Sequence, residues 1–412
     1  MNSANRLFPP GRLQWLDAAR GLALFGMIVT HIFSLSTDDL EPTWAVVFAG
    51  RSSALFAVLA GFSLVLASRS RSLSTPGKAI AAAVIRGIII FAIGLVLGTV
   101  STRLAIILTV YGFLFIAASV LLPLRGRTLA ALAAVWLVAS PLVSHAVRAH
   151  WQLEQDFNVP SLDSLYDPAG LLQSVVLIGY YPALQWMSYI LVGMTLAHVP
   201  WSRQTAITAS AVGLGTAIMA SAISSLLLVS RGWEVLSASA AEEPGLLEQA
   251  TTYGNWGTVP TDTAWWLAVN GPHTGTPPDL VGTAGVAVAV IGMFCLLFTS
   301  FPALAPRLLL PLTAPGSMAL TAYSLHVVLL EMTAGMAPTQ EYVTHALVLI
   351  GIAVVWKALI SRRGPLETAI AAIVRLAVRG KRTRRGRVSR TRCEAPRFGW
   401  ISWIRGERFA PL

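Results

Sequence analysis

The chain has 412 residues, of which 55% are hydrophobic and only 12% are charged, and its mean hydropathy is +0.66. Soluble globular domains carry about 25% charged residues, so the composition excludes a soluble fold and predicts an all-α, polytopic integral membrane protein. The formal net charge of +11 is not a nucleic-acid signature, because most of the basic excess lies in one segment near the end of the chain.

Ten apolar stretches are long enough to be predicted as membrane-spanning helices of one bundle. They lie near residues 13–34, 44–67, 79–100, 104–123, 128–147, 171–198, 205–229, 280–301, 308–331 and 343–361. The sixth is interrupted by Pro182, which is also compatible with a short helix followed by the true span.

The charges between these stretches predict their orientation. When alternate connections are assigned to the cytoplasm, starting from the N-terminus, the charged residues that they contain before Glu367 are all basic: Arg69, Arg71, Lys78, Arg125, Arg127, Arg203, Arg307, Arg362 and Arg363. The other connections hold most of the acidic residues and only three basic ones, Arg103, Arg148 and Arg231. This asymmetry follows the positive-inside rule and predicts that both termini are cytoplasmic.

The first stretch contains ionisable residues at both of its ends, in "LDAARGLALFGMIVTHIF". Asp17 and Arg20 are three residues apart near the predicted inner end, so they share a helix face and can form an ion pair. A purely structural pair explains them as well as a functional one. Arg86 lies a short way above the inner end of the third stretch, where it can snorkel to the interface or pair with Asp17.

A second group of ionisable residues is predicted near the outer face, although its members come from distant segments: His31, Arg51, His273, His326 and Glu331. His145 and His345 also lie near outer ends, so a shared height alone does not define a site. An interfacial position is the commoner role for a single histidine there. Arg51 is two turns into its span and therefore needs a partner, such as Glu331 or an anionic substrate.

Two predicted outer segments are long, residues 148–170 and 231–279. The second is rich in aromatic residues: Trp233, Tyr253, Trp256, Trp265 and Trp266. A belt at the membrane interface is the more usual role for such residues, and a platform that stacks on the sugar rings of a substrate is the alternative. The bundle is predicted to occupy residues 1–370.

The last segment, residues 371–412, is a basic tail. Residues 375–392 hold nine basic residues and no acidic one. We expect the tail to be disordered or to lie on anionic lipids at the cytoplasmic surface. The two cysteines, Cys295 in an apolar stretch and Cys393 in the tail, predict neither a disulfide nor a metal site.

The first two stretches resemble the opening of the transmembrane acyltransferase superfamily. Its type 3 members show a Leu-Asp-x-x-Arg-(Gly/Ala) pattern with a histidine fourteen residues after the aspartate, which Asp17, Arg20, Gly21 and His31 match. The second-span pattern Phe-x-x-x-Ser-Gly-Phe is met from Phe56 to Phe62, with alanine in place of serine.

The rest of residues 12–370 resembles more closely the bacterial proteins similar to the catalytic domain of heparan-α-glucosaminide N-acetyltransferase. The matching stretches are "YYPALQWMSYILVGMTL", "PHTGTPPDLVGTAGVAVAVIG", "GSMALTAYSLH" and "RRGPLE". In those enzymes the catalytic histidine lies just before the second span, where this chain reads "STDDLEPTW". His31 is the nearest equivalent here.

The resemblance implies that an acyl group, most simply acetyl, passes from cytoplasmic acyl-CoA to an envelope sugar, glycolipid or polysaccharide at the outer face of the plasma membrane. The phosphates of CoA need cations at the inner end, which Arg20 and Arg86 offer, with Asp17 holding Arg20 in place. No metal ion is expected.

At the outer end the acceptor needs a general base, and His31 is the first candidate, followed by His326 and His273. A transient acyl-histidine is an alternative route. The oxyanion formed at the thioester needs a donor, for which Arg51 or Tyr323 is suited, and Glu331 is a further substrate-binding candidate.

Three other functions are compatible with the sequence. Ten spans with a broken sixth helix are compatible with a transporter or flippase, although no internal repeat is visible. A structural membrane protein would leave Arg51 and the grouped histidines without a purpose, and a non-enzymatic relative of the acyltransferases would keep the fold without the activity. Histidines that converge on one cavity, continuing to Arg20 and Arg86, would favour the acyltransferase.

Overall fold

The computed structural model describes residues 6–8, 11–37, 41–70, 73, 75–100, 104–243 and 245–378. Within these ranges the chain is helical, with no β-strand apart from one isolated bridge between Ser36 and Pro42. The all-α prediction is therefore confirmed. Arg71 and Arg103, which entered the charge argument, lie outside the described residues.

Among the described residues, six helical segments are long and apolar enough to cross a membrane. Four of them are single helices: α4 (Pro76–Val100), α6 (Gly126–Trp151), α12 (Pro277–Ser300) and α16 (Pro338–Leu359). The segment Trp44–Ser68 contains α3 (Arg51–Ser68). The segment Arg203–Ser239 contains α9 (Arg203–Leu227) and α10 (Trp233–Ser239). A seventh results if Pro168–Ile178, which begins with α7 (Pro168–Gln173), and α8 (Ala183–Leu196) form one span bent by 58°. These helices make the chain an integral membrane protein.

The predicted number of ten spans is not confirmed. α2 (Gln14–Ile32) carries polar side chains, which lower its hydropathy, and α5 (Leu108–Ser119) has only 12 residues. The predicted stretch 308–331 is divided into α14 (Leu310–Gly316) and α15 (Ala319–Met332). Met318 between them has a non-helical backbone, with φ −136° and ψ 45°, which ends the regular helix.

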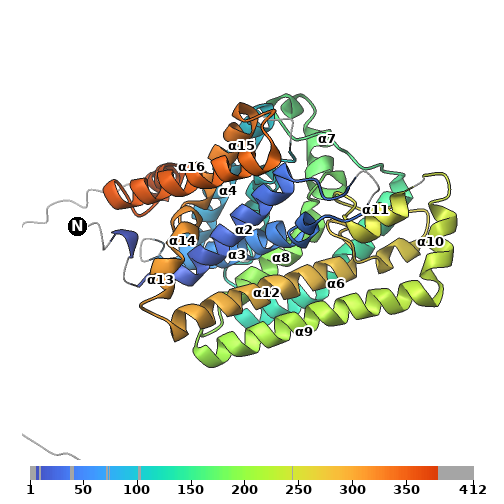
Figure 1. Cartoon of the computed structure of the whole chain (residues 1–412), viewed down its shortest axis with the longest axis horizontal. Coiled ribbons are helices and arrows are strands. Elements are labelled where there is room, and N and C mark those ends of the chain that lie inside the picture. Colours follow the sequence, from blue (N-terminus) through green and yellow to red (C-terminus); the bar gives the residue numbers. More distant parts are fainter. Residues whose placement is uncertain are drawn as a thin grey trace, which may run out of the picture. The chain divides into compact units, whose positions relative to one another are not determined.

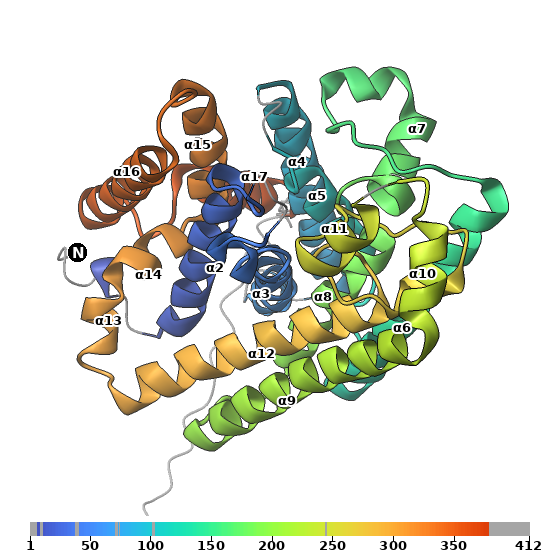
Figure 2. The ribbon, with the colours of Figure 1, turned by 45° about the vertical axis from the view of Figure 1, so that its right-hand side comes forward.

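The first two long helices occupy the centre of the bundle. Most residues of α2 and α3 are buried, and in Figure 2 these helices lie between α14–α16 on one side and α8 and α12 on the other. Outside this core, α9 and α12 run side by side along one edge (Figure 1). The site residues of α2 and α3 are therefore held by helices on several sides.

Glycines allow the closest helix contacts. A Cβ atom on Gly193 of α8 would lie 1.9 Å from the carbonyl oxygen of Val58 in α3. One on Gly61 of α3 would lie 2.2 Å from the carbonyl oxygen of Ile190 in α8. Small residues at such crossings let backbones approach within membranes, so α3 and α8 are in close backbone contact.

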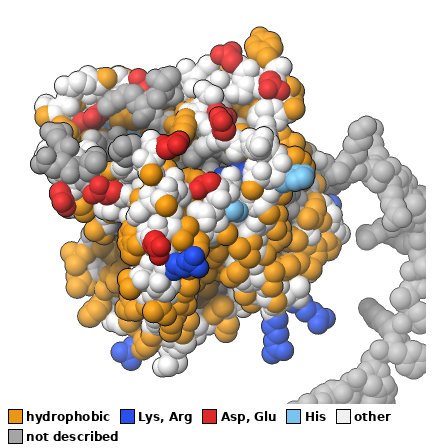
Figure 3. All heavy atoms as spheres, turned by 90° about the vertical axis from the view of Figure 1, so that its right-hand side faces the viewer, with side chains coloured by type: hydrophobic (Ala, Val, Ile, Leu, Met, Phe, Trp, Pro, Cys, Tyr) orange, Lys and Arg blue, Asp and Glu red, His pale blue; other side chains and the backbone are white. Residues whose placement is uncertain are grey.

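The outer helices present apolar side chains to their surroundings. Val135 of α6, Leu226 of α9 and Leu347 of α16 are each more than 60% exposed. In Figure 3 acidic side chains gather in the upper part of one face, a broad hydrophobic surface lies below them, and basic side chains project at the lower edge. A hydrophobic surface of this extent suits lipid contact rather than water.

The long connections and the C-terminal part also contain short helices. The segment 231–279 holds α10, α11 (Leu246–Thr252) and a 3-10 turn at Ala264–Ala268, and α13 (Ala305–Leu308) follows α12. The last described helix, α17 (Pro365–Val378), extends past residue 370, where the basic tail was predicted to begin. The tail from residue 379 onward lies outside the described residues.

Candidate active site

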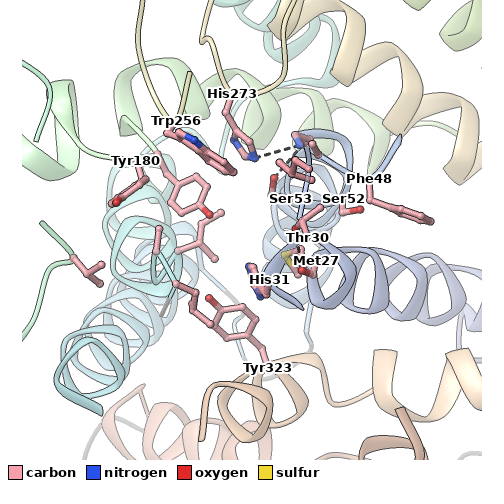
Figure 4. Close-up of a pocket in the computed structure, with 18 of the residues that line it drawn as sticks. Met27, Thr30, His31, Phe48, Ser52, Ser53, Tyr180, Trp256, His273 and Tyr323 are labelled. Carbon is pink, nitrogen blue, oxygen red and sulfur yellow. Dashed lines mark hydrogen bonds between the residues drawn. The ribbon is translucent and has the colours of Figure 1, made fainter. Parts of the chain in front are cut away.

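A cavity of about 340 Å³ opens where α2 ends and α3 begins (Figure 4). His31 of α2, Tyr323 of α15 and His273 of the 231–279 segment all line it. Aromatic side chains contributed by three connections and the turn before α3 complete its walls: Phe48, Phe157, Tyr180, Tyr181 and Trp256. The cavity thus combines two histidines with an aromatic lining of the kind found in small-molecule sites.

His31 is supported from behind by two more histidines. Its Nδ1 atom lies 3.0 Å from Nε2 of His326 in α15, and Nδ1 of His326 lies 2.8 Å from Nδ1 of His345 in α16. Both supporting histidines have no exposed surface. These three histidines form a row in which each contacts the next. Among the described residues, His31 lines the cavity and the other two do not, so they can influence chemistry there only through His31.

His273 is held in a slot between indole rings. Its ring stacks on Trp186 and Trp256 with centroid distances of 6.1 and 5.8 Å, and its Nε2 accepts a hydrogen bond from the amide of Gly50 at 3.2 Å. Burial lowers the pKa of His273 from 6.5 to about 4, so it is neutral near pH 7. Because Nε2 is an acceptor, the neutral ring carries its proton on Nδ1.

The backbone around this slot is unusual. His273 and Trp256 have φ values of +55° and +44°, in the left-handed region that non-glycine residues seldom occupy. Gly50, which has φ +69°, ends the preceding turn and donates to His273. Such strained positions persist only when the surrounding structure holds them, and they concentrate at functional sites.

The opposite end of α2 carries an ion-pair network. Asp17 is 1% exposed and accepts from Nη1 of Arg20 at 2.7 Å, while Nη2 of Arg20 donates to the hydroxyl of Ser63 at 2.7 Å. Arg12 also pairs with Asp17 and donates to the carbonyl of Ser317 at 3.2 Å. The sequence-predicted pair of Asp17 and Arg20 is present, in a larger network that sequence reasoning did not include.

Two further cations lie towards this end of the bundle. Arg86 of α4 is within electrostatic range of Arg363. Lys357 of α16 is fully buried, and its Nζ makes no hydrogen bond to a described residue. Its side chain therefore points into the protein instead of towards the membrane interface. Arg20 and Arg86 are not among the residues that line the His31 cavity.

Arg51 and Glu331 do not line the His31 cavity either. Arg51 donates to the carbonyl oxygens of Val46 and Val47 at 3.1 and 3.3 Å and lines a neighbouring cavity of about 430 Å³, together with Asp279. Arg51 therefore lines a cavity walled by residues of α9 and α12, and His31 lines a different one. The backbone carbonyls are partners that a sequence pattern could not identify.

Of the predicted site residues, the structure brings His31, His273 and Tyr323 into one cavity and places His326 directly behind His31. Their catalytic roles stay predictions. Sequence reasoning missed Trp186, which forms one side of the His273 slot, and His345, whose position near an outer helix end was noted without a role. Glu341 and His345 are four residues apart on α16, a helical spacing that could have drawn attention to them.

These features define an integral membrane protein with a histidine-lined cavity at one end of its helical bundle. The family model described as heparan-alpha-glucosaminide N-acetyltransferase, catalytic, matches residues 12–230. The match covers more than half of the chain, so the chain belongs to this family of membrane acetyltransferases. No curated protein matches the chain. The matched part contains His31 and Arg51, whereas His273, His326 and His345 lie beyond it.

Proposed function

We propose that the chain transfers an acetyl group from acetyl-CoA to an amine or hydroxyl of an envelope sugar, glycolipid or polysaccharide at the outer face of the plasma membrane. The observation that carries the proposal is the position of His31 at the cavity, with Nδ1 engaged by His326. Its Nε2 is then the nitrogen that can serve the acceptor. Membership in the acetyltransferase family supports the same reaction.

In the proposed step, Nε2 of His31 removes the proton of the acceptor while its nitrogen or oxygen attacks the thioester carbon. The new bond forms as the carbon–sulfur bond breaks, and the electron pair leaves with the sulfur of CoA. The proton finally returns to the thiolate or to solvent. We infer that Tyr323, which lines the cavity and whose hydroxyl is buried, donates to the oxyanion.

The donor and acceptor would approach from opposite ends of α2. Asp17 and His31 are fourteen residues apart, about 21 Å along a helix. We infer that the phosphates of CoA bind near Arg20 and Arg86 on the cytoplasmic side, and that its extended pantetheine arm carries the acetyl group towards His31. The aromatic walls offer flat surfaces for a sugar ring, which favours a carbohydrate acceptor.

Replacing His31 with alanine tests the proposal. Membranes that contain the chain would be incubated with radiolabelled acetyl-CoA and glucosamine as the probe acceptor. We expect His31→Ala to reduce transfer at least about 100-fold, the lower range for loss of a general base. His150→Ala is the matched control, because His150 is exposed at the end of α6. Transfer that is equal in both variants would remove His31 from the mechanism.

A transporter or flippase is the second candidate, and one observation favours it. The chain is broken between Ile178 and Ala183 at a bend of 58°, and Tyr180 and Tyr181 in the break line the His31 cavity. Broken helices that line a cavity are typical of transporters. Movement of glucosamine into vesicles without its acetylation would support this function over the transferase.

A further inference from the structure

We propose that Glu341, Thr333 and His345 act with His326 as a relay that fixes which nitrogen of His31 carries the proton and receives the proton taken from the acceptor. This inference rests on the proposed role of His31. It assigns positioning functions to Glu341 and His345 of α16 and to Thr333, which follows the end of α15. None of these three residues lines the cavity. Each successive pair is joined by one short polar contact.

The relay continues from His345 to a carboxylate. Nε2 of His345 lies 3.0 Å from the hydroxyl oxygen of Thr333, and this oxygen lies 2.8 Å from Oε1 of Glu341. Thr333 and Glu341 are 8% and 3% exposed. The row therefore runs through buried groups from Glu341 to the cavity, and its order is set by three separate segments of the chain.

The position of the hydroxyl proton of Thr333 sets which atom donates and which accepts in every hydrogen bond of the row. The hydroxyl lies within hydrogen-bond distance of Oε1 of Glu341, of the carbonyl oxygen of Leu329 at 2.9 Å, and of Nε2 of His345. In the proposed relay it donates to the Glu341 carboxylate, because a hydrogen bond to a charged acceptor is the strongest of the three. Its oxygen then accepts from Nε2–H of His345. A neutral His345 then has its lone pair on Nδ1 and accepts from Nδ1–H of His326.

The same rule carries the proton position to the cavity. A neutral His326 that donates through Nδ1 has its lone pair on Nε2, where it accepts from Nδ1–H of His31. His31 is left with a lone pair on Nε2, the form that a general base needs. Each histidine thus fixes the tautomer of the next one. Groups that hydrogen-bond to the second ring nitrogen of a catalytic or metal-bound histidine have the same effect.

The row also offers a path for the proton after the reaction step. When Nε2 of His31 takes the proton of the acceptor, Nδ1–H can pass to His326, the Nδ1 proton of His326 to His345, and the Nε2 proton of His345 to Thr333. The hydroxyl proton of Thr333 then passes to Glu341, which becomes neutral. One proton enters the row and one reaches the carboxylate, so charge and atoms balance. When the thiolate of CoA takes the Nε2 proton of His31, the same transfers run in reverse and restore the Nδ1-protonated form of His31 and the charge of Glu341.

Several other groups surround His31 and must be considered in its pH dependence. His273 and His345 are within electrostatic range of it, and the hydroxyls of Tyr180, Tyr181 and Tyr323 line the same cavity. None of these groups is an anion near pH 7 in its ordinary state. Glu341 is the acidic group joined to His31 through the row, so removal of its charge is the specific perturbation.

The tautomer of His31 can be measured directly. The full chain, labelled with isotopic nitrogen in histidine and placed in lipid vesicles, would be examined by solid-state NMR near pH 7, with the His31 signal identified by its loss in His31→Ala. We expect His31 to carry its proton on Nδ1 in the natural chain. In Thr333→Val the hydroxyl that orients the row is absent, so we expect a mixture of both tautomers.

Two control variants distinguish the loss of the orienting hydroxyl from a general disturbance of the fold. Thr333→Ser keeps the hydroxyl and should keep the Nδ1-protonated form. Thr344→Val should also keep it, because the hydroxyl of Thr344 on α16 donates to the carbonyl of Gln340 and Thr344 is outside the row. A His31 proton on Nε2 in the natural chain, or the same spectrum in Thr333→Val as in Thr344→Val, would overturn the relay.

Transfer to glucosamine provides the second readout. We expect Thr333→Val to lower kcat about tenfold with little change in KM, a part of the effect of a general base. Glu341→Gln should in addition move the acid limb of the kcat profile to lower pH, because loss of the carboxylate makes the row less basic; an unmoved limb would contradict the relay. The expected tautomer without any transfer in the natural chain would refute the proposed function alone.

Discussion

At the scale of single residues, the chemistry of the cavity depends on histidines kept in defined neutral forms. His31 and His273 face the same space but are held differently, the first by another imidazole and the second by a backbone amide between two indole rings. Sequence spacing could place both near one membrane face. It could not show that His326 lies behind His31, because this contact joins residues 295 positions apart through tertiary packing.

The pH dependence of stability tests the environment of His273. Its pKa is about 4 in the folded chain and near the ordinary 6.5 in the unfolded chain, so the unfolded state binds more protons between these values. The contribution of neutral His273 to the free energy of unfolding is therefore fully present above about pH 6.5 and is lost as the pH falls towards about 4. In His273→Gln, whose amide oxygen can still accept from Gly50, we expect a smaller decrease of Tm between about pH 7 and about pH 5. An equal decrease in both proteins would contradict the buried neutral histidine.

At the scale of elements, the positions of the long helices could be predicted because an apolar run of sufficient length has few other uses. α4, α6, α9, α12 and α16 all overlap their predicted stretches. Hydropathy could not show that the stretch 308–331 is divided at Met318, because a helix ends through local backbone geometry that leaves the hydrophobic composition unchanged. It also did not distinguish the short α5 from a full span.

Two glycine-to-alanine substitutions, one at the contact between α3 and α8 and one in α9, should change stability in opposite directions. Gly193→Ala would place a Cβ atom against the carbonyl of Val58, so we expect a loss of about 1–3 kcal/mol of stability from overpacking. Gly215→Ala in α9 has open space around the new atom and should stabilise its helix by up to about 1 kcal/mol. Thermal unfolding of both variants in detergent measures the difference. Two equal shifts would show that the close approach of α3 and α8 is not tight.

At the scale of the whole molecule, the charge distribution predicts the orientation in the membrane. Gln204 and Ser237 are exposed at opposite ends of the helical segment Arg203–Ser239. In a chain whose two cysteines have been replaced by serine, we expect a membrane-impermeant maleimide to label Ser237→Cys in intact cells and Gln204→Cys only after lysis. The reverse pattern would place the His31 cavity on the cytoplasmic side.

The shortness of α5 and α15 has a consequence for the bilayer itself. These helices have 12 and 14 residues, about 18 and 21 Å, whereas the hydrocarbon layer is about 30 Å thick. Most of α5 is buried, but α15 exposes Met332, and a short helix that faces lipid draws headgroups and water towards the protein. Tyr323 of α15 and Ile107, directly before α5, both border the cavity. We therefore expect the low-dielectric layer to be thin beside the site, and under the proposed function an acetyl group delivered along this wall would have a shorter distance of hydrocarbon to cross.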